Sequence, residues 1–119
     1  MIFKGISKCF SLKNEDQYNT IGDFYDELSS IYGLENLKGL GYKWENGYIW
    51  YAIGLKDGDI PEYNLEIELP DDGWNIKEGL TDNLKDIYDE LYKVNSIKYE
   101  LETFTNDGRC MIKYIYNKD

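Results

Sequence analysis

The chain has 119 residues, of which 23 are acidic and 13 are basic, so its formal net charge at pH 7 is −10. A field of this sign repels phosphate backbones and anionic lipid surfaces and favours cationic partners, so we expect no direct binding to nucleic acid or to membranes. A solubilising acidic surface is the simpler alternative. Hydrophobic residues make up 42% of the chain, enough for one compact domain or for two half-sized modules that share a core.

Histidine is absent from the sequence. This excludes serine–histidine and cysteine–histidine catalysis, the common histidine-bearing zinc sites and histidine-ligated haem. Acid–base chemistry would have to come from Asp, Glu, Lys or Tyr. Cys9 and Cys110 have no paired spacing, and there is no secretory segment and no apolar run of membrane length. We therefore expect a cytoplasmic protein with free thiols, no metal site and no cofactor.

The first half of the chain is predicted to contain a strand, a helix and two further strands. These are a strand over 2–12, a helix from about Thr20 to its stop at Gly33, and strands over 37–43 and 48–55. Thr20 is expected to cap the helix. Asn46-Gly47 is expected to form the hairpin turn between the two strands, because this pair tolerates positive φ. Residues 56–61 are the predicted linker.

The second half shows the same order of elements, with one additional short strand before the helix. A strand over 63–69 with clean alternation is followed by a short strand over 74–79, a helix from about 81 or 82 to 94, and strands over 97–104 and 110–116. The turn between the last two strands is Thr105-Asn106-Asp107-Gly108. The pattern predicts an α+β fold, an antiparallel sheet with two helices on one face.

A short segment of the first predicted helix recurs in the second. Asp23-Phe24-Tyr25-Asp26-Glu27-Leu28 returns as Asp86-Ile87-Tyr88-Asp89-Glu90-Leu91. The repeat favours a duplicated β-α-β-β module, with pseudo-repeats over about 1–58 and 62–117 and a cleft between the halves, where pockets often form. The alternative is two acidic amphipathic helices that coincide by chance. In the helical register the acids face solvent, and Tyr25 and Tyr88 are expected to face the seam between the two halves.

Three groups of residues stand out, namely Ile21-x-x-x-Tyr25, then Gly47 with Tyr51-Ala52-Ile53-Gly54, and Glu102-Thr103-Phe104 followed by Asp107-Gly108. In this order they resemble the GyrI-like small-molecule-binding domain, which is also the effector-binding domain of AraC-type and MerR-type multidrug-responsive regulators. The resemblance covers nearly the whole chain and implies a single domain over 1–119. Tyr25 stands where the family usually has Trp, and Phe104 where it usually has Tyr.

The resemblance implies that Glu102 points into a cavity between the helices, where a carboxylate among aromatic rings attracts organic cations. Glu100 lies on the same strand face, because strand side chains alternate. The alternative for Glu102 is a solvated residue on an edge face. The aromatic candidates for the ligand site are Tyr25, Trp50, Tyr51, Trp74, Tyr88 and Phe104. Trp50 and Tyr51 face opposite ways, so only one of them can line the cavity, and core packing is the alternative for each aromatic residue.

Three functions remain open at this point. The first is a stand-alone domain that binds cationic or aromatic small molecules, as a monomer or homodimer, and acts by sequestration or through a partner regulator. The second is a small hydrolase of reactive electrophiles, in which Glu102 activates water and Tyr51 or Tyr88 assists. The third is a protein–protein module that inhibits a gyrase through its acidic surface.

Overall fold

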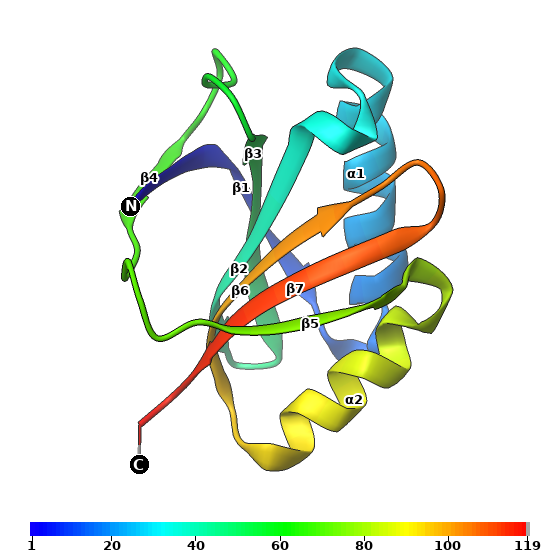
Figure 1. Ribbon diagram of the computed structural model, residues 1–119, viewed down its shortest axis with the longest axis vertical. Helices are drawn as coiled ribbons and strands as arrows, with labels where there is room; N and C mark the ends of the chain where they lie inside the picture. Colours follow the sequence, from blue (N-terminus) through cyan, green and yellow to red (C-terminus); the bar gives the residue numbers. More distant parts are fainter. Residues whose placement is uncertain (119) are drawn as a thin grey trace.

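The computed structural model describes residues 1–118. Its seven strands form one antiparallel sheet in the order β4-β1-β3-β2-β6-β7-β5 (Figure 1). The strands are β1 (Ile2–Ser11), β2 (Leu37–Glu45), β3 (Tyr48–Leu55), β4 (Leu65–Glu68), β5 (Asn75–Leu80), β6 (Ile97–Phe104) and β7 (Arg109–Tyr116). The predicted α+β class and antiparallel sheet are confirmed.

The helices are α1 (Gln17–Tyr32) and α2 (Leu84–Val94), and a short 3-10 turn over Thr81–Asn83 precedes α2. Helix α1 begins at Gln17, so the predicted cap at Thr20 is wrong. The Thr20 hydroxyl instead donates a hydrogen bond to the carbonyl of Asp16, one turn back. The helix starts earlier because Tyr18 and Ile21 both pack against the core, and packing outweighs a capping preference.

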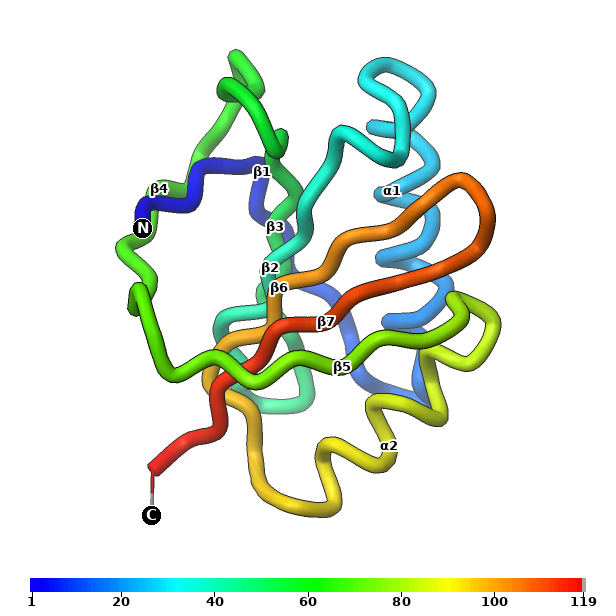
Figure 2. Tube along the Cα trace, in the orientation of Figure 1, coloured from blue at the N-terminus to red at the C-terminus, as the bar shows by residue number. Residues whose placement is uncertain are grey.

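Alternation along the strands divides the apolar residues between two faces of the sheet. On one face the strands and both helices form the main core, which includes Phe24, Leu28, Ile49, Ile53, Ile87 and Leu91. On the other face Phe3, Leu40, Ala52 and Leu69 form a smaller cluster without helical residues. Both helices therefore cover the same face, and the N-terminus lies on the side away from them (Figures 1 and 2).

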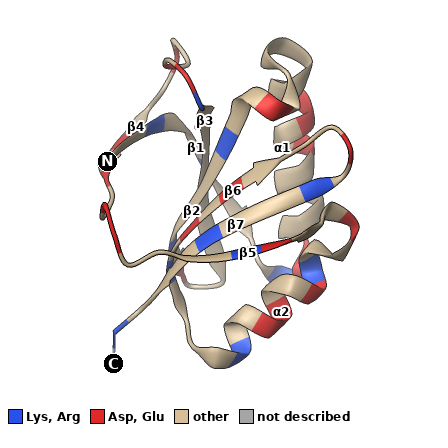
Figure 3. Ribbon diagram, in the orientation of Figure 1, with Lys and Arg blue, Asp and Glu red and all other residues tan. Residues whose placement is uncertain are grey.

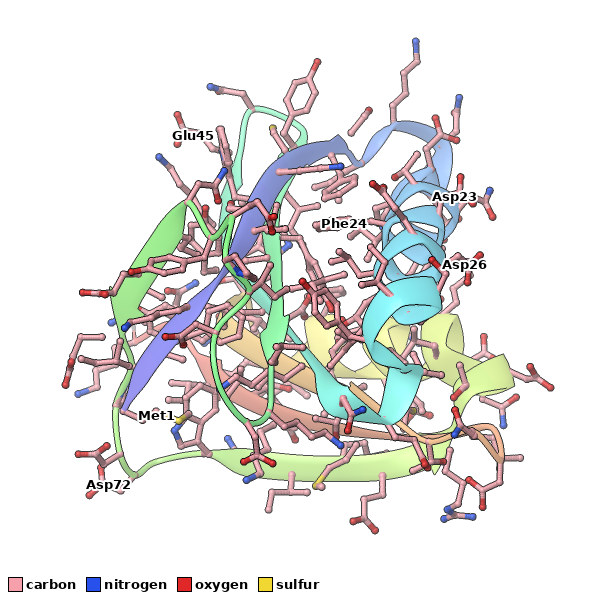
Figure 4. All side chains as sticks on the ribbon, turned by 90° about the horizontal axis from the view of Figure 1, so that it is seen from above. Met1, Asp23, Phe24, Asp26, Glu45 and Asp72 are labelled. Carbon is pink, nitrogen blue, oxygen red and sulfur yellow. The ribbon has the colours of Figure 1, made fainter. Side chains whose placement is uncertain are left out.

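Both copies of the repeated segment are helical and have the same pattern of burial. The buried positions are Phe24, Tyr25 and Leu28 in α1 and Ile87, Tyr88 and Leu91 in α2. The acids between them are exposed. Figure 4 shows Phe24 directed toward the sheet and Asp23 away from it, and Figure 3 shows acidic residues along the outside of both helices. The helical register therefore places the acids in solvent.

Loop geometry agrees with the predicted turns. Asn46 and Gly47 have φ values of 53° and 81°, the left-handed conformation that a tight hairpin requires and that this pair adopts easily. Neither helix of residues 1–118 has the length and apolar character needed to cross a membrane.

Candidate ligand-binding site

A cavity of about 690 Å³ lies against the helix-covered face of the sheet. Both helices contribute to its lining, as do β2, β3 and β6. Aromatic side chains make up much of the lining, namely Tyr18, Tyr25, Trp44, Tyr51, Tyr88, Tyr92 and Phe104. The volume is in the range that encloses a drug-sized organic molecule.

Two glutamates of β6 lie within this lining. Because Glu100, Glu102 and Phe104 alternate with Leu101 and Thr103, all three face the helices. Glu100 is 3% exposed and Glu102 is 4% exposed. Full burial of two carboxyl groups is uncommon in proteins, because each loses its hydration. The alternative of a solvated Glu102 on an edge face does not fit this burial.

Glycines of β2 stand opposite the two glutamates. In the register of β2 and β6, Gly39 pairs with Glu102 and Gly41 pairs with Glu100. A Cβ atom at Gly39 would lie 1.8 Å from the hydroxyl oxygen of Tyr25 and 2.0 Å from that of Tyr51. At Gly41 it would lie 2.7 Å from Glu100 Oε1. The polar groups of the site therefore occupy the space that side chains on β2 would fill.

A chain of hydrogen bonds connects α1 to Glu102. The hydroxyl of Tyr51 donates to Glu102 Oε1 at 2.5 Å, and its oxygen is 2.5 Å from the hydroxyl oxygen of Tyr25. Since Tyr51 gives its proton to the carboxylate, Tyr25 is the donor in the second bond. Glu100 is held separately, by a 3.0 Å hydrogen bond from the Tyr92 hydroxyl to its Oε2. Each carboxyl group thus accepts a hydrogen bond from a different tyrosine.

Four buried polar atoms of the cavity lining have no hydrogen-bond partner among the described residues, namely Gln17 Oε1, Thr81 Oγ1, Glu102 Oε2 and the hydroxyl oxygen of Tyr88. Tyr88 is near enough to help lower the pKa of Glu102, but the two groups do not reach hydrogen-bond geometry. An unpartnered buried polar group costs about 1–3 kcal/mol. The site therefore has unused capacity to bind a polar or charged group.

Burial changes the acid–base properties of the whole site. Loss of hydration raises the pKa of Glu100 well above its ordinary value of 4.5, and the charge of Glu102 raises it further. Burial also raises the pKa of Glu102, which the hydroxyls of Tyr51 and Tyr88 partly offset. The same cause raises the pKa of Tyr25, Tyr51 and Tyr88 well above 10. The tyrosines therefore stay neutral donors, and Glu102 is the easier of the two carboxyl groups to ionise.

The structure brings together most of the predicted ligand-binding residues. Glu102, Tyr25, Tyr51, Tyr88 and Phe104 all line the cavity, and the ring of Tyr25 meets that of Phe104 edge-on, with centroids 5.0 Å apart and planes at 80°.

The two predicted tryptophans are not part of this cavity. Trp50 is 37% exposed and lies on the sheet face opposite Tyr51, so Tyr51 is the one of the pair that lines the cavity. Trp74 packs on that same opposite face, where its indole nitrogen donates to the carbonyl of Pro70. The sequence did not define which face the start of β5 presents.

The lining residues that were not among the predicted site residues include three aromatic residues and one glutamate, namely Tyr18, Trp44, Tyr92 and Glu100. Helical spacing was the available signal for Tyr92, which follows Tyr88 by one turn and stacks on it at 5.6 Å. Strand alternation indicated the face of Glu100. Trp44 carried no comparable signal, because the irregularity in the pairing of β2 with β3 between Gly41 and Lys43 shifts the alternation.

Within residues 1–118, no cluster of three or more Cys, Asp or Glu side chains is placed to hold a metal ion. No protein-family model, curated protein or solved structure matches the chain. The resemblance to the GyrI-like domain stays a prediction, and the geometry of the site has to carry the functional argument.

Proposed function

We propose that the chain is a small-molecule-binding domain that captures amphipathic organic cations in the aromatic cavity, with Glu102 as the principal anionic contact. The observation that carries this proposal is the unpartnered Oε2 of Glu102, an oxygen of a 4% exposed carboxyl group that borders the cavity. Binding would serve to sequester the ligand or to signal its presence to a partner protein.

The charge balance of the cavity supports a cation. Its acidic lining residues are Asp26, Asp82, Glu100 and Glu102, whereas Lys85 is the one basic lining residue in the described part of the chain. Lys85 forms ion pairs with Glu15 and Asp89, each at 3.1 Å, so it is not available to neutralise the glutamates. A buried carboxylate without a counter-charge is strongly unfavourable. A bound cation would supply that charge and remove the penalty.

The aromatic lining supports an amphipathic cation over a small hydrated one. Tyr25, Tyr51 and Tyr88 line the same cavity as Glu102, and the negative faces of such rings attract cations that have been stripped of water. Apolar lining residues such as Ile21, Leu34 and Ile49 favour an attached hydrocarbon or aromatic group. The site thus combines one buried charge with a largely apolar wall.

The fold suggests how the site arises. We propose that the chain is a duplicated β-α-β-β module, with β1-α1-β2-β3 as one copy, β5-α2-β6-β7 as the other, and the cavity as a cleft between them. The sheet order supports this, because β1-β3-β2 is followed across the β2–β6 boundary by β6-β7-β5, the same order in reverse. Tyr25 and Tyr88 hold equivalent positions in the repeated segment and both line the cavity.

The test uses two ions of nearly the same shape and opposite charge, tetraphenylphosphonium and tetraphenylborate. We expect the cation to raise the melting temperature in a concentration-dependent way, since a ligand of the folded state stabilises it by mass action, and the anion to have no effect. Glu102→Gln, which keeps an acceptor for Tyr51, should abolish most of the shift. Equal shifts with both ions, or a shift that survives Glu102→Gln, would refute the proposal.

The hydrogen bond from Tyr51 to Glu102 also supports a second candidate, hydrolysis of a reactive electrophile. Glu102 Oε2 would take a proton from water while the water oxygen attacks the electrophilic carbon, and Tyr88 would donate a hydrogen bond to the substrate. The bond to the leaving group, an aryl oxide in the case of an aryl ester, would then break, and the leaving group would take the proton back from Glu102. A raised pKa suits this general-base role near neutral pH. Turnover of an activated aryl ester that is lost in Glu102→Gln would favour this candidate.

A further inference from the structure

We propose that the ligands of this cavity are organic dications, with one cationic centre bound by Glu102 and the other by Glu100. This inference rests on the proposed function and makes it more specific. A single buried carboxylate would be enough for a monocation, so the second one needs an explanation of its own.

The spacing of the two glutamates fits two separate charges. They are separated by one residue on β6 and point to the same face. Side chains two positions apart along a strand are about 7 Å apart. The two ends of a five-carbon chain that carries a cation at each end match this distance, and a compact monocation can contact only one carboxylate at full strength.

Independent tyrosines fix the two carboxyl groups. Tyr51 of β3 binds Glu102, whereas Tyr92 of α2 binds Glu100. Neither tyrosine serves both glutamates. If Glu100 served only to orient Glu102, a contact between the two carboxyl groups would be expected, but in residues 1–118 the hydrogen bonds of each lead to a different element.

The glycines of β2 keep both carboxyl groups accessible from the cavity. Gly41 has no side chain that would occupy the space of Glu100. In the same way, Gly39 has none that would occupy the space of the hydrogen-bonded Tyr25 and Tyr51. Two glycine–glutamate pairs in consecutive positions on the same face of neighbouring strands form a double site.

Charge compensation then favours a dication. Two carboxylates this close repel each other, so with a monocation bound one of them stays protonated or unpaired. The basic residue of the lining, Lys85, is already paired with Glu15 and Asp89. A dication can neutralise both carboxylates at once, and only then does the second buried carboxylate contribute to affinity.

The test compares pentane-1,5-bis(trimethylammonium) with pentyltrimethylammonium, whose charges do not depend on pH, by isothermal titration calorimetry. We expect the dication to bind wild-type protein at least about tenfold more tightly, which corresponds to about 1.4 kcal/mol. In Glu100→Gln the ratio should fall to about one. Glu78→Gln removes an exposed carboxylate of β5 that does not line the cavity and should leave the ratio unchanged.

A second measurement needs only wild-type protein. Shortening the spacer to ethane-1,2-bis(trimethylammonium) should remove the advantage, because its two charges cannot span both carboxylates. Equal binding of the monocation and the five-carbon dication would overturn this inference and leave the proposed function standing. Failure of every cation, tetraphenylphosphonium included, would refute both.

Discussion

The packing of Gly39 provides a test of the site that does not depend on any ligand. In Gly39→Ala the new methyl group would lie 1.8 Å from the Tyr25 hydroxyl oxygen and 2.0 Å from that of Tyr51. Two non-bonded heavy atoms cannot approach this closely, so both rings must move. Their movement breaks the hydrogen bonds from Tyr25 to Tyr51 and from Tyr51 to Glu102.

The expected cost has two parts. Overpacking of a filled interior costs about 1–3 kcal/mol, and each lost hydrogen bond costs a net amount of about 0.5–1.5 kcal/mol. Two hydrogen bonds are lost, so we expect Gly39→Ala to lower the free energy of unfolding by about 2–6 kcal/mol. For a domain of this size the whole free energy of unfolding is only about 5–15 kcal/mol, so the effect should be large in urea denaturation.

A matched control is Gly22→Ala in α1. A Cβ atom at Gly22 meets no heavy atom within 4 Å, and alanine is preferred over glycine inside a helix by about 1 kcal/mol. This variant should therefore be as stable as wild type or slightly more so. In the Tyr25→Phe/Tyr51→Phe background the hydroxyl oxygens are gone, and Gly39→Ala should cost less than it does in wild type. An equal cost in both backgrounds, or a neutral Gly39→Ala, would show that the hydroxyl pair is not packed against Gly39.

Two further predictions concern protonation and fluorescence. Because burial raises the pKa of Glu100 and Glu102 above 4.5, the folded state binds more protons than the unfolded state above about that pH. The stability of wild type relative to Glu100→Gln/Glu102→Gln should therefore fall as pH rises, by up to about 1.4 kcal/mol per pH unit for each group; a relative stability that rises with pH in urea titrations would contradict this. Trp44 lines the cavity and Trp50 does not, so a change in tryptophan fluorescence on binding tetraphenylphosphonium should be lost in Trp44→Phe and kept in Trp50→Phe. The reverse result would place the ligand on the other face of the sheet.

The order of elements was predictable because it depends on local signals. Strands 48–55 and 97–104 were bounded correctly, since each is bordered by a turn with residues that adopt positive φ. The start of α1 was not predicted, because a favourable cap at Thr20 was outweighed by the packing of Tyr18 against residues distant in the chain. Local propensity therefore predicts that a helix forms, whereas tertiary contacts determine the residue at which it begins.

Alternation along a strand predicted which site residues share a face of the sheet, but not which residues of other strands lie opposite them. Period-two spacing put Glu100 beside Glu102 and separated Trp50 from Tyr51. It did not show that Gly39 stands opposite Glu102, because that pairing depends on the register between strands from different halves of the chain. The participation of Trp44 and Tyr92 depends on the same long-range arrangement.

The two carboxylates of β6 fit into the site because the neighbouring strand β2 has glycines opposite them. The helix-facing positions of β2 and β6 share one space at their boundary, so large polar side chains on one strand require small residues on the other. Gly39 cannot exchange roles with Glu102, because the Tyr25 and Tyr51 hydroxyls already occupy the space beside Gly39. Tyrosines from β3 and α1 thus dictate that β6 carries the charge. This asymmetry between β2 and β6 gives the site a single carboxylate pair instead of two pairs that would repel each other.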